Sequence, residues 1–360
     1  MKILIFNPFG IGDVLFTTPL IRNIKEHLPS SYIGYISNRR TFPLLEDNIF
    51  LDKVFIFEKD EWRKDLRRSK VSFLKRAVSF WRNIKKEKYD VVFDLSLNPY
   101  YRLFLKTLYI KKRIGFSFKN RRHFLTHKIN ILYYKDKHVA HYYLELAKFL
   151  NIPTRDYKFD IFFKKEDWEK AEVFLEKYNI KRDDLLIGLV PGSGDSWNER
   201  AYYKRWPEQY FAYLVNLLIK ELEAKVVLFG SSKEISVVDK VYNLSNFKPV
   251  NLAGKLTLKE FCSVLSFCDL VVTNDGGPLH IAQALGKKVV VLFGPVDENV
   301  YGLYPNETLG IVIKKDIPCR PCYKMFKFRG CLYDKKCLRD IRVKEVFDAV
   351  KQILSRDKEK

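Results

Sequence analysis

Residues 274–280 of this 360-residue chain read Asn-Asp-Gly-Gly-Pro-Leu-His and have the composition of an anion-binding turn. An apolar segment, 270–273, precedes them and predicts a strand, and a helix is expected from about 279 to 285. Gly277 and Pro278 then fall at the helix start, where proline loses no hydrogen bond. Two successive glycines let a ligand approach the backbone, and the first N–H groups of the helix lack partners. The turn therefore predicts a phosphate site, most simply for a nucleotide diphosphate.

The chain opens with the same order of strand, glycine turn and helix. A strand is expected at 2–7 and a helix up to about 27, with Gly10-Ile11-Gly12-Asp13 between them. Two interpretations of Asp13 stay open: it satisfies N–H groups at the helix start, or it is a general base in a cleft between two domains. Leu15 stands where a dinucleotide fingerprint needs its third glycine. The arginine pair 39–40 suits a 2′-phosphate, so an NADP-dependent oxidoreductase remains an alternative.

Three residues of the second half are further candidates. Lys204 follows the glycine-rich loop 191–196 and precedes a helix expected from 207, so it either meets a phosphate or is an ordinary solvated lysine. Glu234 follows a strand expected at 225–229 and is placed to accept hydrogen bonds from ribose hydroxyls. His280 lies one turn into the helix behind the two glycines, where it either donates to a phosphate or packs in the core.

The elements that must position these residues alternate between strand and helix patterns, which favours parallel sheets with crossover helices. The polar stretch 179–184 predicts a junction, after which the pattern restarts with a strand at 186–190. A chain of 360 residues suits two domains. We therefore expect an α/β protein with two Rossmann-like parallel-sheet domains, 1–180 and 181–360, facing an interdomain cleft.

Composition narrows the class of protein. Hydrophobic residues make up 47% of the chain, as in a globular protein, and no apolar run approaches the roughly 18 residues of a membrane span. Asn7, Pro8, Gly10 and Asp13 break the first apolar run at once, which does not suit a signal peptide. These features predict a cytoplasmic location.

The net charge of +22 is concentrated in one part of the chain. Residues 1–165 hold 34 Lys and Arg against 16 Asp and Glu, whereas the remainder holds 31 against 27. Many of the basic residues fall in 63–88 and 102–137, and the second run is interleaved with aromatic residues. A solvated surface, an anionic membrane or lipid headgroup, and nucleic acid are the three possible explanations. No nucleic-acid recognition motif accompanies the charge, so we expect no nucleic-acid partner.

Taken together, several motifs resemble glycosyltransferase family 9, the bacterial heptosyltransferases of lipopolysaccharide core synthesis. They are Gly10-Ile11-Gly12-Asp13 with Thr17-Thr18-Pro19, Lys204-Arg205-Trp206-Pro207, the turn 274–280, and Phe293-Gly294-Pro295. The resemblance spans most of the chain. It implies a GT-B fold, in which the first domain holds mainly the acceptor and the second the nucleotide sugar.

The resemblance also implies an inverting, metal-independent transfer of a heptose from an ADP-sugar, without a cofactor. Asp13 would be the catalytic base and Lys204 would neutralise the leaving diphosphate. Many relatives carry serine or threonine where Gly276 stands, so a contact there must come from the backbone. The residues expected to bind substrate are Gly10, Gly12, Thr17, Thr18, Ser193, Gly194, Glu234, Asp275, Gly276, Gly277 and His280.

The expected partners are ADP-heptose and an anionic acceptor of the lipopolysaccharide core. The basic first half predicts that Lys119, Arg121 and Arg122 contact this acceptor, and that the protein is peripheral on the cytoplasmic face of the inner membrane. A transferase for a different nucleotide sugar and a non-catalytic anionic-lipid-binding protein are also compatible with these features.

Four of the six cysteines lie within 19 residues, at Cys319, Cys322, Cys331 and Cys337. Their spacing suits a four-sulfur metal site such as structural zinc, although it is not a familiar zinc-finger pattern. The same residues could instead form disulfides or stay free thiols, and a reducing cytoplasm disfavours the disulfides. None of these interpretations makes the cluster catalytic.

Overall fold

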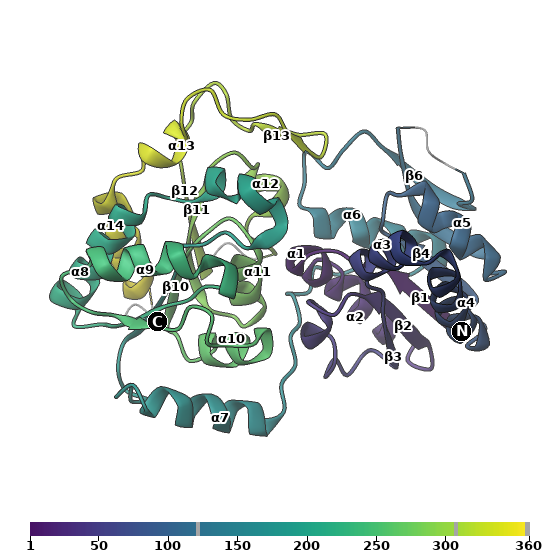
Figure 1. Ribbon diagram of the computed structural model, residues 1–360, viewed down its shortest axis with the longest axis horizontal. Coiled ribbons are helices and arrows are strands. Elements are labelled where there is room, and N and C mark those ends of the chain that lie inside the picture. The colour runs from purple at the N-terminus through teal and green to yellow at the C-terminus, as the bar shows by residue number, and fades with distance from the viewer. Residues whose placement is uncertain (120–122, 306–308, 357–360) are drawn as a thin grey trace. The chain divides into compact units, whose positions relative to one another are not determined.

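The computed structural model describes residues 1–119, 123–305 and 309–356 (Figure 1). The chain divides into two compact units, each made of two segments. Unit 1 comprises Met1–Tyr134 and Val139–Tyr157, and unit 2 comprises Lys135–His138 and Lys158–Lys360.

The division lies at 157/158, whereas the sequence placed the junction at 180/181. Helix α7 (Lys165–Glu176) accounts for the difference. Within unit 2, Asp167 of this helix pairs with Lys259 Nζ at 3.1 Å, and the Trp168 ring lies 5.6 Å from that of Phe267. These contacts fix the helix to unit 2.

Unit 1 is built on a parallel sheet of six strands. Their order across the sheet is β3-β2-β1-β4-β5-β6, so Ile3 of the first strand lies between Ile33 and Val91. The edge strand β6 was not predicted from the sequence. The strands are β1 (Lys2–Phe6), β2 (Tyr32–Ser37), β3 (Lys53–Ile56), β4 (Val91–Asp94), β5 (Lys112–Phe118) and β6 (His127–Ile131).

The helices of unit 1 differ from expectation near the start of the chain, where the helix expected up to about residue 27 is two helices. A short 3-10 turn lies at Phe42–Leu44. The helices are α1 (Ile11–Leu15), α2 (Thr18–His27), α3 (Lys59–Arg68), α4 (Lys70–Lys86), α5 (Pro99–Thr107) and α6 (Val139–Glu145), followed by the 3-10 segment Leu146–Leu150.

Unit 2 repeats the same topology. Its strands lie in the order β12-β11-β10-β7-β8-β9 and all neighbours are parallel. When the strands of unit 2 are numbered with β7 as the first, their order across the sheet is the same as in unit 1. The strands are β7 (Leu186–Val190), β8 (Lys225–Leu228), β9 (Val250–Asn251), β10 (Leu270–Asn274), β11 (Lys288–Phe293) and β12 (Gly310–Lys314), and a separate hairpin joins β13 (Tyr323–Lys324) to β14 (Lys327–Phe328).

The helices of unit 2 connect these strands as crossovers. A 3-10 segment, Asp195–Lys204, carries the candidate lysine at its last position. The others are α8 (Glu208–Leu222), a 3-10 turn at Ser232–Glu234, α9 (Ile235–Leu244), α10 (Leu258–Leu265), α11 (Gly277–Ala284), α12 (Glu298–Tyr301), α13 (Lys336–Arg339) and α14 (Val343–Ser355).

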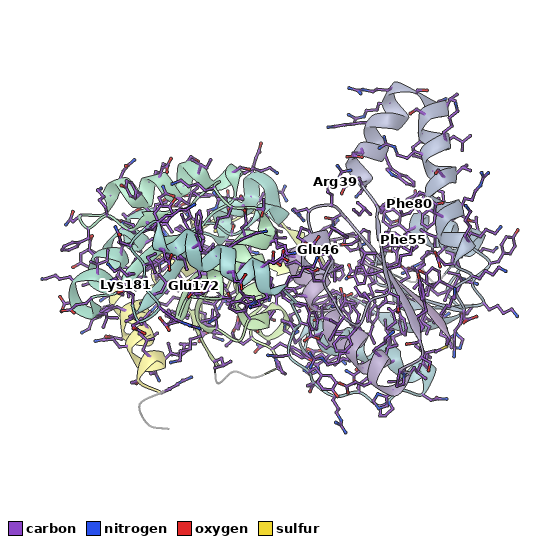
Figure 2. All side chains as sticks on the ribbon, turned by 90° about the horizontal axis from the view of Figure 1, so that it is seen from below. Arg39, Glu46, Phe55, Phe80, Glu172 and Lys181 are labelled. Carbon is purple, nitrogen blue, oxygen red and sulfur yellow. The ribbon has the colours of Figure 1, made fainter. Side chains whose placement is uncertain are left out.

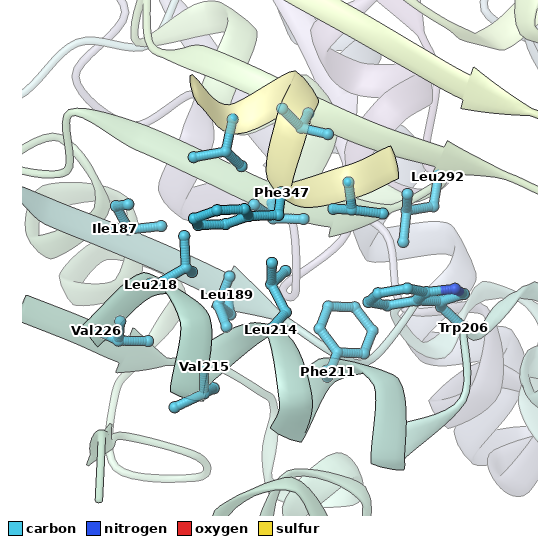
Figure 3. Packing of buried hydrophobic residues seen from close by; sticks show 14 of the residues in the cluster. Ile187, Leu189, Trp206, Phe211, Leu214, Val215, Leu218, Val226, Leu292 and Phe347 are labelled. Atoms are coloured by element: carbon cyan, nitrogen blue, oxygen red, sulfur yellow. The ribbon is translucent and has the colours of Figure 1, made fainter. Parts of the chain in front are cut away.

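A continuous hydrophobic core holds α8 and α14 against the sheet of unit 2 (Figure 3). Leu214 and Leu218 of α8 and Phe347 of α14 pack over Ile187 of β7. Trp206 is fully buried beside them, and its Nε1–H donates to the Ile341 carbonyl at 3.0 Å. This anchor fixes the segment that begins with Lys204.

In both sheets the strand order reverses beside the first strand, between β1 and β4 and between β7 and β10. Ligands of open α/β sheets bind outside the carboxyl ends of the strands at this point. Asp13 follows β1, the loop 191–196 follows β7, and the turn 274–277 follows β10. The fold thus brings each predicted turn to the binding edge of its own sheet.

Candidate active site

Asn274 connects three segments of unit 2. It is fully buried at the end of β10, and its Oδ1 accepts from the Trp206 amide at 3.0 Å. Its Nδ2 donates to the carbonyls of Pro191 at 2.8 Å and Gly192 at 3.0 Å. From the sequence, Asn274 was recognised only as part of a motif. Its position at the end of a buried strand was the available signal for this role, because a buried amide must find partners.

Close packing against the loop after β7 requires glycine at position 276. A Cβ at this position would lie 2.6 Å from the Ser193 carbonyl oxygen, so the loop after β7 and the turn after β10 touch backbone to backbone. A serine or threonine here would require the loop to move, so the packing of this chain favours glycine at 276.

Lys204 and Asp275 form a buried ion pair. Nζ of Lys204 lies 2.8 Å from Oδ2 of Asp275, and the side chains are 6% and 5% exposed. The ammonium group also lies 5.1 Å from the ring centroid of Trp197. A buried pair is held only where geometry compensates the cost of desolvation. Lys204 is therefore a fixed cation beside the turn after β10, and the interpretation as an ordinary solvated lysine is wrong.

Glu234 is buried, and its carboxylate already accepts four hydrogen bonds. Oε1 accepts from the amides of Ser193 at 3.0 Å and Gly194 at 2.9 Å. Oε2 accepts from the amide of Ser231 at 3.0 Å and from its hydroxyl at 2.9 Å. Since a carboxylate offers about four acceptor positions, a ribose hydroxyl would have to displace one of these donors. The observed role of Glu234 is to hold the loop after β7.

The loop 191–196 is shaped around that carboxylate. A Cβ on Gly192 would collide with the Glu234 side chain, and Gly194 has a φ of +74°, which favours glycine. The Ser193 hydroxyl donates to the Ala201 carbonyl at 3.1 Å. The amides of Ser193 and Gly194 thus point to Glu234, and a direct substrate contact from them stays a prediction.

His280 is buried in the first turn of α11. Burial lowers its pKa well below the usual 6.5, and the nearby His138 and Lys204 act in the same direction. The imidazole is therefore neutral at pH 7. Nδ1 lies 3.4 Å from the Gln283 Nε2, which sets Nδ1 as acceptor and leaves Nε2 as the N–H donor.

In unit 1, Asp13 lies at the third position of α1. Its Oδ2 accepts from the Gly10 amide at 3.1 Å. Desolvation raises its pKa above the usual 3.8, and the Gly10 amide and the Arg40 guanidinium oppose the rise. The helix-start interpretation is thus confirmed by this hydrogen bond. It is compatible with the base interpretation, because a raised pKa makes a carboxylate a stronger base.

Thr17 and Thr18 support the backbone around Asp13. The Thr17 hydroxyl donates to the Asp13 carbonyl at 2.9 Å and accepts from the Asn7 Nδ2 at 2.9 Å. The Thr18 hydroxyl donates to the Leu15 carbonyl at 2.8 Å. Both threonines are buried, so they position α1, and their contact with substrate stays a prediction, as does that of Gly10 and Gly12.

The clustered cysteines line a single cavity of about 10 Å³ in unit 2. All six cysteines are free, which excludes the disulfide interpretation in this structure. Burial, then the neighbouring Cys319, raises the pKa of Cys322 to about 12, and burial raises the pKa of Cys337 to about 11. Among the described residues, no group of three or more His, Cys, Asp or Glu is arranged to hold a metal ion.

The sequence model of the family described as glycosyltransferase family 9 (heptosyltransferase) matches residues 77–332 of the chain. The chain belongs to this family. It is therefore a glycosyltransferase, and the resemblance to family 9 is confirmed; the matched residues include Lys204 and the turn 274–280.

The chain is similar to a heptosyltransferase in sequence and to solved structures in fold. The chain is 27% identical over 359 residues to lipooligosaccharide heptosyltransferase 2 of Campylobacter jejuni, covering 98% of both chains. It matches the family 9 glycosyltransferase of Veillonella parvula with a TM-score of 0.83 and 24% identity, over 99% of this chain and 97% of that one. Heptosyltransferase WaaC of E. coli, solved with ADP, matches with a TM-score of 0.73 and 19% identity over 99% and 100%. The expected two-sheet α/β fold is thereby confirmed.

Proposed function

We propose that this glycosyltransferase moves a heptose from ADP-heptose to a hydroxyl of the lipopolysaccharide core with inversion, and that Asp13 is its general base. The observation that carries the proposal is the Asp13 carboxylate after β1, anchored by the Gly10 amide and raised in pKa, in a chain of the heptosyltransferase family. The names of the relatives, lipooligosaccharide heptosyltransferase 2 and WaaC with ADP, support the acceptor and the nucleotide.

The proposed reaction is a single displacement. The acceptor hydroxyl attacks the anomeric carbon, Asp13 takes its proton, and the bond to the diphosphate oxygen breaks. One displacement inverts the anomeric configuration. A hydroxyl is far too weakly acidic to ionise alone, and general-base help is worth about 10²–10⁴-fold. Thr17 would contribute by fixing the backbone of α1.

Lys204 and the start of α11 would stabilise the leaving ADP. The ammonium group of Lys204 is held beside the turn after β10 by Asp275. The N–H groups of the first turn of α11, which begins at Gly277, add a favourable dipole for an anion. Neutral His280 would donate one hydrogen bond from Nε2. These groups supply charge stabilisation without a metal ion, which is the basis for proposing metal-independent transfer.

The basic unit 1 fits an anionic, phosphorylated acceptor. Lys119 belongs to the second basic run of the sequence, while Arg121 and Arg122 lie outside the described residues. We propose that these three side chains contact the acceptor. Neutralising all three should then raise acceptor KM at low salt more than at high salt, because screening weakens exposed charges.

Two further parts of the proposal concern location and metal content. Among the described helices, none is both long and apolar enough to cross a membrane. We propose a peripheral association with the cytoplasmic face of the inner membrane. A zinc ion held by Cys319, Cys322, Cys331 and Cys337 remains a prediction, and metal analysis of purified protein together with thiol titration tests it.

The decisive test is transfer from ADP-heptose to a Kdo-lipid acceptor in EDTA by wild type, Asp13→Asn and Glu26→Gln. Glu26 is an acidic residue of α2 outside the proposed site and serves as the control. We expect Asp13→Asn to lose at least about 10²-fold in kcat, the usual scale of general-base catalysis. Unchanged turnover in Asp13→Asn would exclude it as the base, and transfer from another nucleotide sugar would replace heptose in the proposal.

A further inference from the structure

The outer face of α4 carries three exposed apolar residues in one stripe. Val71, Leu74 and Val78 are three and four positions apart, so they lie on the same side of the helix. They are 63%, 61% and 44% exposed. The adjoining side of α4 packs into the core of unit 1 through Ala77, Trp81 and Ile84. The apolar surface of the helix is therefore wider than the part that the core covers.

Basic side chains flank the exposed stripe. Helix α4 contains six lysines and arginines and no acidic residue. Lys75, Arg82 and Lys86 line the same shallow hollow, of about 510 Å³, as Leu74 and Val78. Apolar and positively charged side chains thus line the same hollow.

Helix α5 continues this surface. Phe104 of α5 stacks on Trp81 of α4, with ring centroids 5.5 Å apart. Nζ of Lys85 lies 4.5 Å from the centroid of the Tyr109 ring, which is 78% exposed. Tyr100 of α5 is 74% exposed. Figure 2 shows α4, paired with α3, extending outward from unit 1 near the labelled Phe80.

Helix α7 of unit 2 shows that exposed apolar residues alone do not define such a surface. Trp168 and Val173 of this helix are 41% and 55% exposed. However, α7 carries five acidic residues against two lysines. An anionic surface would repel α7, whereas it would attract α4.

We propose that the α4–α5 face docks on an anionic phospholipid bilayer; this face consists of Val71, Leu74, Lys75, Val78, Arg82 and Lys86 with Tyr100. The apolar stripe would enter the boundary between headgroups and acyl chains, and the lysines and arginines would contact the phosphates. Tyrosine suits the same depth because its ring is apolar and its hydroxyl is polar. Nucleic acid would engage the charges but gives no reason for the stripe.

Vesicle co-sedimentation of the full chain tests the proposal without any sugar substrate. We expect binding to phosphatidylglycerol vesicles at least tenfold stronger than to phosphatidylcholine, and a further tenfold loss between 0.1 M and 0.5 M NaCl. The variant Lys75→Glu/Arg82→Glu/Lys86→Glu should bind phosphatidylglycerol vesicles at least tenfold more weakly than wild type. The variant Leu74→Asn/Val78→Asn should bind them at least threefold more weakly. The control Lys170→Glu/Lys177→Glu/Lys181→Glu changes net charge equally on exposed positions of unit 2 and should stay within twofold of wild type.

Three results would overturn the proposal: equal binding to both vesicle types, equal losses in the test and control triple variants, or α4-dependent binding to duplex DNA without binding to vesicles. Circular dichroism checks that each variant is folded. A second assay rests on the proposed function, and compares transfer to a vesicle-embedded acceptor with transfer to an acyl-free one. The α4 variants should lose only the first activity. Loss of both, with vesicle binding intact, would contradict the α4–α5 face without affecting the transferase proposal.

Discussion

Replacing Asp275 by asparagine should leave Lys204 buried without its counter-ion. The pair is 2.8 Å apart and both side chains are almost fully buried, so solvent cannot take over the role of Asp275. Breaking a buried pair from one side typically costs about 3–5 kcal/mol. For a unit of about 200 residues, a loss of about 3 kcal/mol lowers Tm by about 6–12 °C. We therefore expect Asp275→Asn to lower the thermal midpoint of the free protein by this amount.

We further expect bound ADP to restore the thermal stability that Asp275→Asn removes. If the diphosphate becomes the counter-ion of Lys204, saturating ADP should raise the Tm of Asp275→Asn more than that of wild type. The double variant Lys204→Met/Asp275→Asn removes both charges, so it should be more stable than Asp275→Asn and should lose the response to ADP. Differential scanning fluorimetry with and without ADP measures all three. Equal ADP responses in wild type and Asp275→Asn would refute the assignment of Lys204 to the diphosphate.

Three further predictions concern buried titratable or hydrogen-bonded groups. In Glu234→Gln one side-chain oxygen becomes an amide nitrogen and can no longer accept its two hydrogen bonds, so the variant should lose about 3 kcal/mol of unfolding free energy in urea. The control is Glu260→Gln, because a single oxygen of Glu260 accepts both bonds from Thr257. This control should lose less than about 1 kcal/mol. Because the pKa of Asp13 is raised in the folded state, the folded protein binds more protons than the unfolded chain at pH values above 3.8. The free energy of unfolding therefore falls as the pH rises from 3.8 through the raised pKa. Asp13→Asn should therefore gain stability over wild type at pH 7, and urea titrations should show the gain shrinking toward pH 4. The pKa of His280 is lowered in the folded state, so below pH 6.5 the unfolded chain binds the proton more readily and the free energy of unfolding should fall as the pH drops. In urea titrations, His280→Gln should show a weaker dependence of unfolding free energy on pH than wild type, and an equal dependence would contradict this.

The sequence predicted the repeating features of the fold because they depend on local patterns. Alternating apolar strands and helices indicated parallel sheets, and the glycine turns around Asp13 and Gly276 indicated which loops reach the binding edge. The edge strand β12 (Gly310–Lys314) was not predicted. The strand β6 (His127–Ile131) alternates polar and apolar residues, but it lies within the basic run that was interpreted by its charge.

The break between α1 and α2 was beyond local patterns. The Thr17 hydroxyl and the Asn7 side chain both bond the Asp13 carbonyl, which interrupts the helix where apolar periodicity continues. The site was predicted incompletely for a similar reason. The four donors on Glu234 and the three bonds of Asn274 come from segments up to 83 residues apart, and no spacing in the sequence indicates them.

Calorimetric titration of the purified protein with ADP in EDTA, beside UDP, GDP, CMP and NADP, tests the central claim most directly. We predict that ADP alone binds tightly and that Lys204→Met weakens this binding at least tenfold. Preference for another nucleoside diphosphate would keep the proposed chemistry and discard ADP-heptose. Binding of NADP alone, or of no nucleotide, would contradict the proposed donor site.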